Sequence, residues 1–251
     1  FISLAVCIAS CVFFEYILRR MMKRPQTISD MSAVVTGMLL GMNLPPTINP
    51  LYGVIGSFVA IGIAKQLFGG IGQNFANPAI VGRIVLMLSF TASMSTWCKP
   101  FYYLNGADVV TGATPLVSKD ADYLSLLLGT TGGCIGETCA IALIAGGIYL
   151  IAARIITPHA PAAFIGTGFL LTLIAGDDPI YAVLSGGLII GAYFMATDYA
   201  TTPLTGKGKI IFGIGCGLIT FAIRKFGNYP EGVSFSILLM NLLVPYIDRL
   251  C

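Results

Sequence analysis

The stretch PAAFIGTGFLLTLIAG, residues 161–176, contains no charged side chain. A helix needs about 20 mostly apolar residues to cross the hydrocarbon core of a bilayer, and this stretch approaches that length. Continuous apolar stretches favour helices, because a membrane β-barrel alternates apolar and polar residues. The sequence therefore predicts an all-α polytopic membrane protein, a bundle of about eight to ten transmembrane helices. We expect spans at residues 1–18, 31–44, 50–68, 78–96, 137–156, 161–176, 179–197, 208–224 and 232–250.

The composition excludes several other classes of protein. Only 10% of the 251 residues are charged and 56% are hydrophobic, whereas a soluble domain carries about 25% charged residues. Disorder needs the opposite composition, with low hydrophobicity and high charge. A formal net charge of +3 from scattered basic residues does not suit binding to nucleic acid. The class that the composition leaves is an integral membrane protein in contact with the lipid bilayer.

Basic residues in the short loops predict the orientation in the membrane, because lysine and arginine favour the cytoplasmic side. If the loop after the first span is cytoplasmic, nine basic loop residues, Lys65 among them, fall inside and four fall outside. This orientation puts the long polar loop, residues 97–136, on the outer side. The sequence starts within an apolar stretch at Phe1, so we expect an N-terminal part to be missing.

The chain also contains an internal sequence similarity, in which three features recur in the same order about 125–131 residues apart. We therefore expect one integral membrane domain, residues 1–251, with a first repeat at about 30–96 and a second at about 161–250. The short segment 31–44 is a candidate interrupted helix. If it crosses the membrane fully, the two repeats run in the same direction; if it is a half-helix, the repeats are inverted. The recurring pairs are Thr36–Leu40 with Thr167–Leu171, Asn49-Pro50 with Asp178-Pro179, and Asn77-Pro78 with Thr202-Pro203.

Two polar segments of the long loop could bind a ligand. In DVVTGATPL, residues 108–116, Gly112 permits a tight turn and a close approach to a ligand, although spacing alone favours a plain polar external turn. The Gly-rich segment 132–139 opens an apolar helix, whose N-terminus could bind an anion. Alternatively, Glu137 is an acidic first-turn residue and Thr138 lies near the cap.

Three charged residues lie in or beside predicted spans. Arg83 lies about one turn inside the span that begins at Asn77, where an unpaired arginine is costly. It either faces an anionic partner or extends to the interface. Asp198 and Asp248 each lie near the end of an apolar helix. They are either solvated boundary carboxylates or contacts for a cation or a cofactor at a broken helix, and Arg249 is an easy partner for Asp248.

Six sequence blocks, in this order and from about residue 30 onward, together resemble the D subunit of Rnf complexes (RnfD) and the related B subunit of the sodium-pumping NADH:quinone reductase (NqrB). Each block is weak alone, but six in family order are specific. The short loops favour the Rnf-type subunit. The blocks are NPAIVGR at Asn77–Arg83, TGATPL at Thr111–Leu116, GET at Gly136–Thr138, FMATD at Phe194–Asp198, NYPEG at Asn228–Gly232 and MNLLVPYID at Met240–Asp248.

The resemblance implies an electron-transfer subunit of an ion-translocating oxidoreductase. In the family, FMN is attached through its phosphate to the second threonine of a [ST]-G-A-T motif, which here is Thr114. Thr111, Gly112 and Ala113 are the other residues of that motif. A noncovalent riboflavin is also implied, without residues to place it. Further candidates near the flavin are Arg83, Glu137 and Thr138, and Asp198 and Asp248 are candidates for a cation pathway.

The resemblance further implies coupling of electron flow between ferredoxin and NAD to movement of Na⁺ or H⁺ across a prokaryotic inner membrane. The partners would be a flavin-bearing G subunit, membrane A and E subunits, and peripheral subunits that carry Fe–S clusters and bind NAD. The chain itself has no G-x-G-x-x-G motif after a strand and no Fe–S cysteine pattern. The alternative from composition alone is a cofactor-free solute channel or transporter with inverted repeats.

Overall fold

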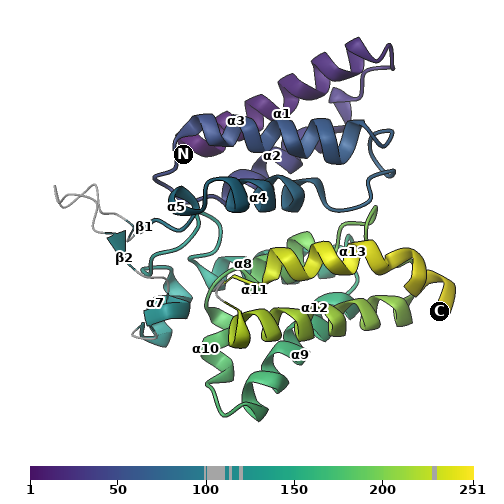
Figure 1. Ribbon diagram of the computed structural model, residues 1–251. Helices are drawn as coiled ribbons and strands as arrows, with labels where there is room; N and C mark the ends of the chain where they lie inside the picture. The colour runs from purple at the N-terminus through teal and green to yellow at the C-terminus, as the bar shows by residue number, and fades with distance from the viewer. Residues whose placement is uncertain (99, 101–110, 113–114, 119–120, 228–230) are drawn as a thin grey trace.

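The computed structural model describes residues 1–98, 100, 111–112, 115–118, 121–227 and 231–251. Its helices form two groups, one from each half of the chain, which lie side by side (Figure 1). The two groups meet where α4 (Pro78–Ser89) packs against α13 (Val233–Leu250). The predicted all-α architecture is confirmed, apart from one short two-stranded ribbon among the described residues.

The first group is built around α1 (Ile2–Met21), which packs against α2 and α3. Asn49 and Asn77 each cap a helix that begins with proline, because their side-chain oxygens accept the backbone N–H two residues later, at 3.0 Å in both cases. The other elements of this group are η1 (Ile28–Asp30), α2 (Ser32–Met42), α3 (Pro50–Phe58), its π-helical continuation η2 (Val59–Gln66) and α5 (Thr91–Met94).

In the second group, glycines allow α9 and α12 to pack closely. A Cβ on Gly213 would lie 2.6 Å from the carbonyl oxygen of Ala160, and one on Gly217 would lie 2.7 Å from Thr167 Cβ. Small residues at such contacts are typical of membrane helix pairs. The elements are α8 (Ala140–Ala152), α9 (His159–Ile174), α10 (Pro179–Leu184), α11 (Leu188–Ile190), the π-helical η4 (Gly191–Met195), α12 (Gly206–Phe226) and α13.

The predicted outer loop contains the ribbon. Strand β1 (Trp97–Cys98) pairs antiparallel with β2 (Thr111–Gly112), so that Trp97 lies opposite Gly112. The helices α6 (Pro115–Ser118) and α7 (Tyr123–Leu128) follow. The ribbon and α7 lie at the end of the bundle where α10 is also found (Figure 1). Ala113 and Thr114 lie outside the described residues.

Three predicted spans differ from the observed helices. The helix from Pro78 ends at Ser89 rather than near residue 96, because Phe90 leaves the helical backbone region. The helix predicted from Glu137 begins at Ala140, after a turn. The span predicted at 179–197 is interrupted between α10 and α11, where Gly186 has a φ of +68° that disfavours other residues.

Within the part of the chain that the structure describes, three helices are long and apolar enough to cross a membrane, namely α1, α12 and α13, and four shorter apolar helices accompany them. Large apolar side chains are exposed along their outer faces, for example Ile174 on α9 and Leu239 on α13. In a membrane such a surface faces lipid rather than water. The chain is therefore a multi-pass integral membrane protein.

The predicted repeats share local structure at two of their three paired features. Thr36–Leu40 and Thr167–Leu171 both lie inside helices, α2 and α9. Asp178 caps α10 as Asn49 caps α3, and both helices begin with proline. A π-helical segment follows in each half, η2 and η4. The third pair differs, because Asn77-Pro78 starts α4, whereas α12 starts after Thr205, beyond Thr202-Pro203. The division into two repeats stays a prediction.

Candidate functional site

Arg83 is the centre of a buried polar cluster. The residue is 1% exposed. One guanidinium nitrogen, Nη1, donates to Asn43 Oδ1 at 2.8 Å and to Ser234 Oγ at 3.1 Å. The other, Nη2, donates to Glu137 Oε1 at 3.0 Å and also to Glu231 Oε2. The prediction that Arg83 faces a partner is confirmed, and extension of its side chain to the interface is excluded.

The cluster joins four segments that are distant in sequence. Arg83 comes from α4, Asn43 caps the end of α2, Glu137 precedes α8, and Glu231 with Ser234 lies at the start of α13. Arg83 and Glu231 are 148 residues apart along the chain. A guanidinium has five donors in a planar fork, which is why one side chain can bind several acceptors at once.

Two buried carboxylates share this one guanidinium. Glu137 and Glu231 are 5% and 4% exposed. If both are ionised, the cluster carries one excess negative charge. Desolvation of charges is expensive, so such groups are retained only with good partners. Removing Arg83 leaves both carboxylates without a cation, whereas removing one carboxylate leaves a neutral pair.

The same carboxylates and Cys134 Sγ lie within 4.8 Å of one another, which is metal-like spacing. However, Arg83 Nη2 already donates to both carboxylates and lies 3.5 Å from Cys134 Sγ. A metal ion would have to displace the guanidinium from its hydrogen bonds. The geometry therefore defines an ion-pair cluster.

The backbone break between α10 and α11 closes over this cluster. An ideal Cβ built on Gly187 would lie 2.7 Å from Glu137 Oε1 and 3.7 Å from Arg83 Nη1. Only a residue without a side chain lets the backbone pass so near the ion pair. The interruption in the predicted span is therefore a part of the site.

Glu137 and Thr138 are predicted at the start of a helix, and the structure corrects this detail. The helix is capped by Cys139 without a side-chain hydrogen bond, and Glu137 instead pairs with Arg83. Thr138 lines a small cavity that Glu137 and Glu231 also line and that Pro115 and Leu116 border. This cavity connects the Arg83 cluster with the segment that follows the TGAT motif.

Asp198 and Asp248 are placed at the opposite end of the bundle. Asp198 Oδ2 accepts from Thr201 Oγ1 at 3.1 Å, and Asp248 Oδ1 accepts from the backbone N–H of Leu204 at 3.0 Å. Both carboxylates therefore hold the loop before α12, and the predicted partner Arg249 is not needed for Asp248. Asp198 also lines a cavity of about 400 Å³ between the two helix groups.

Sequence reasoning assigned no role to Glu231, Asn43 or Ser234. Glu231 lies in the NYPEG block. An acidic residue beside an apolar span, in a chain with few charges, is the sequence signal that could have identified it as a partner for Arg83. A second buried ion pair was also missed, in which Lys65 Nζ lies 2.7 Å from Glu15 Oε2. Lys65 was counted among the loop cations, but it is 3% exposed.

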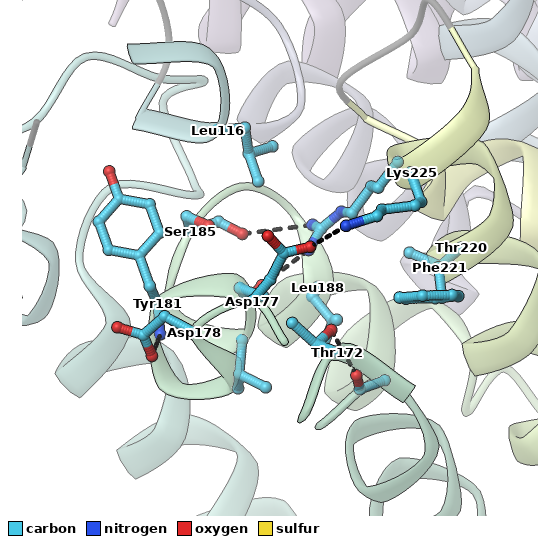
Figure 2. A pocket seen from close by; sticks show the side chains of 14 residues that line it. Leu116, Thr172, Asp177, Asp178, Tyr181, Ser185, Leu188, Thr220, Phe221 and Lys225 are labelled. Carbon is cyan, nitrogen blue, oxygen red and sulfur yellow. Dashed lines mark hydrogen bonds and ion pairs between the residues drawn. The ribbon is translucent and has the colours of Figure 1, made fainter. Parts of the chain in front are cut away.

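A second group of polar residues lies beside the segment after the TGAT motif (Figure 2). Tyr181 donates its hydroxyl to the carbonyl oxygen of Pro115 at 2.9 Å. Asp178, which caps α10, accepts a hydrogen bond from the hydroxyl of Tyr123. This bond, together with backbone N–H donors, lowers the pKa of Asp178 below its ordinary value, and it raises the pKa of Tyr123. These contacts fix the position of the chain immediately after Thr114.

Apolar helices around a buried arginine–carboxylate cluster define a multi-pass membrane protein with an ionisable interior, a feature typical of proteins that move ions or electrons. A family model described as "NQR2, RnfD, RnfE family" matches residues 1–251. The chain belongs to this family, as its sequence blocks predicted.

The chain is similar to the D subunits of several Rnf-type complexes. It is 47% identical to the D subunit of the Na⁺-translocating ferredoxin:NAD⁺ oxidoreductase complex of Acetobacterium woodii, covering 98% of this chain and 79% of the relative. Identity is 46% to the D subunit of the proton-translocating complex of Clostridium ljungdahlii, covering 96% and 79%. It is 38% to the D subunit of the ion-translocating oxidoreductase complex of Stutzerimonas stutzeri, covering 99% and 80%.

Proposed function

We propose that this chain is the D-type membrane subunit of an Rnf-type ferredoxin:NAD⁺ oxidoreductase and relays electrons through FMN esterified to Thr114. Family membership and the names of the relatives support the complex. The observation that carries the flavin assignment is the TGATPL block, residues 111–116, in a chain of this family. When bound, the flavin supplies the redox chemistry, and the protein supplies position and electrostatics.

The described residues next to Thr114 suit an anchored group. Pro115 is buried, and its carbonyl is held by Tyr181. On the other side of Thr114, β2 holds Thr111 and Gly112 against β1. A tether between two such fixed points restricts where an attached ring can lie. Electron transfer between carriers needs a short and constant separation, which this arrangement favours.

We place the protein in a prokaryotic inner membrane, with the 97–136 loop on the outer side. In that orientation the flavin would lie within reach of the flavin-bearing G subunit. The membrane A and E subunits and the Fe–S and NAD-binding subunits would complete the complex. A noncovalent riboflavin would be a second carrier in this chain.

The coupled ion remains Na⁺ or H⁺. The two relatives whose names specify an ion differ in that ion, yet both are nearly equally similar to this chain. Asp198 and Asp248 stay the candidates for a cation pathway, because they hold one loop at the end of the bundle opposite the 97–136 loop.

Intact mass spectrometry of the protein from its native host tests the flavin assignment. We expect an added mass of one FMN minus water, located on the peptide that contains Thr114. Thr114→Ala should abolish in-gel flavin fluorescence of the denatured chain. Thr130→Ala is the matched control, because Thr130 is an exposed threonine of the same loop.

An unmodified wild-type peptide, or a Thr114→Ala variant that keeps its fluorescence, would reject Thr114 as the anchor. A colourless protein that carries a solute across vesicle membranes would instead support a channel or transporter.

A further inference from the structure

A cavity of about 320 Å³ lies among α9, α10 and α12 (Figure 2). Leu116, from the 97–136 loop, is one of its lining residues. Its walls combine apolar and polar side chains, including Leu116, Thr172, Leu188 and Phe221. Cavities of this size, mostly apolar with a few polar groups, are typical of small-molecule and cofactor sites.

Two polar groups of this cavity lack hydrogen-bond partners among the described residues. Ser185 is fully buried, and its Oγ makes no hydrogen bond. Arg224 donates from Nη1 to the carbonyl of Ala182 at 2.7 Å and from Nη2 to that of Ser185 at 3.2 Å, while its Nε is buried without a partner. Buried polar groups are almost always satisfied, so both point to a polar ligand.

The cavity is lined by a residue that follows the predicted flavin anchor closely in sequence. Leu116, two residues after Thr114, lines the cavity, and Tyr181, which also lines it, binds the carbonyl of Pro115. An ideal Cβ on Gly186 would lie 2.6 Å from Leu116 Cδ1, so the break after α10 accommodates this leucine. A group attached to Thr114 is thus tethered beside the cavity by the covalent chain itself.

We propose that this cavity receives the isoalloxazine ring of the flavin on Thr114, an inference that rests on the proposed function. The flat ring has apolar faces, which Leu188 and Phe221 can cover, and one edge of carbonyl and nitrogen acceptors. Ser185 Oγ and Arg224 Nε are donors for that edge. A guanidinium beside the ring also stabilises added negative charge and raises the midpoint potential.

The other charged residues at the cavity do not oppose this assignment. Lys225 Nζ lies 2.5 Å from Asp177 Oδ2 in a partly exposed ion pair at the rim. Asp178 accepts from Tyr123 and from the backbone of α10. Arg224 is therefore the cation that lies deeper in the cavity.

A pair of glycine substitutions on α9 tests the proposal in the purified intact complex. Gly168 lines the cavity, and a Cβ there would make an ordinary 3.4 Å contact with Leu188, so Gly168→Leu fills the space with a side chain that the backbone tolerates. Gly166 on the same helix has nothing within 4 Å of an added Cβ. Gly166→Leu is therefore the matched control.

The signal of the Thr114 flavin is the difference between wild-type and Thr114→Ala complexes in visible circular dichroism and redox titration. We expect Gly168→Leu to keep the covalent flavin, seen as in-gel fluorescence, but to lose its dichroism and to shift its midpoint potential. If the substitution changes the ratio of the binding constants of reduced and oxidised ring tenfold, the midpoint potential of this two-electron couple shifts by about 30 mV. Gly166→Leu should match wild type.

Ser185→Ala is a second test that does not depend on filling the cavity. Removing an unpartnered buried hydroxyl should leave the yield and thermal stability of the complex unchanged or improved. If the hydroxyl binds the ring, the flavin dichroism and potential should still change.

An unaltered flavin signal in both Gly168→Leu and Ser185→Ala, with covalent flavin retained, would overturn the proposal and favour a lipid in the cavity. No difference between wild type and Thr114→Ala would instead reject the proposed function.

Discussion

Arg83→Met is the most informative test of the buried cluster. Methionine keeps much of the length of the side chain and its apolar packing, but it removes the charge and all the donors. The substitution leaves Glu137 and Glu231 buried without the cation that binds both, and it leaves Asn43 Oδ1 without its donor. The perturbation is therefore mainly electrostatic.

The expected cost follows from burial. Breaking a buried ion pair by removing one partner costs about 3–5 kcal/mol, because the remaining charge is uncompensated. For a chain of this size each kcal/mol lowers the melting temperature by about 2–4 °C, so we expect a decrease of about 6–20 °C. Arg83→Lys should recover only part of it, because an ammonium cannot reproduce the forked contacts to four residues.

Thermal unfolding of the detergent-purified protein, followed by loss of the monodisperse peak in size-exclusion chromatography, provides the assay. Lys225→Met is the control, because it also removes the cation of an ion pair, but that pair is 39% and 35% exposed. Exposed pairs contribute at most about 1 kcal/mol. Equal melting temperatures for Arg83→Met and Lys225→Met would refute the reasoning.

Three further predictions concern helix ends and packing. Asn77→Ala should lower the melting temperature more than Asn49→Ala. Both substitutions remove a helix cap worth about 1 kcal/mol, but only Asn77 also donates from Nδ2 to a buried carbonyl, that of Met195, at 3.2 Å. Equal decreases in melting temperature would contradict this. Gly217→Val should separate α9 from α12 and cost about 1–3 kcal/mol, and an unchanged melting temperature would exclude the close contact. The pKa of Asp178 is lowered, so its ionised form stabilises the fold. That stability is fully present above the ordinary aspartate pKa of 3.8 and is lost as the pH falls through the lower pKa of the folded state. Asp178→Asn should therefore flatten the acid side of a profile of melting temperature against pH.

Much of the fold was predictable, because the length and continuity of an apolar stretch in the sequence directly indicate a membrane helix. The proline starts at Pro50, Pro78 and Pro179 were readable, since proline is favoured in the first turn of a helix. The interruption at 185–187 was not predicted, because the apolar stretch continues across it. Its cause is tertiary, namely the approach of Glu137 and Leu116 to the glycine backbone.

The site was predictable only in part. A charged residue inside an apolar span must find a partner, which predicted a paired Arg83 but not which residues pair with it. The partners could not be read from the sequence, because Glu137 and Glu231 are distant from Arg83 along the chain and contact it from other segments of the bundle. The flavin motif was recognised by family resemblance alone, and Ala113 and Thr114 lie outside the described residues.

The separation of Arg83 from its partners has a consequence for biogenesis. A ribosome adds about 5–20 residues per second. Glu137 follows Arg83 by 54 residues and Glu231 by 148, so the second carboxylate emerges about 7–30 s after the arginine. During that interval α4 enters the bilayer with an incompletely neutralised cation. The nascent first half therefore needs the insertion machinery or a neighbouring protein to shelter this helix until Glu231 has been translated.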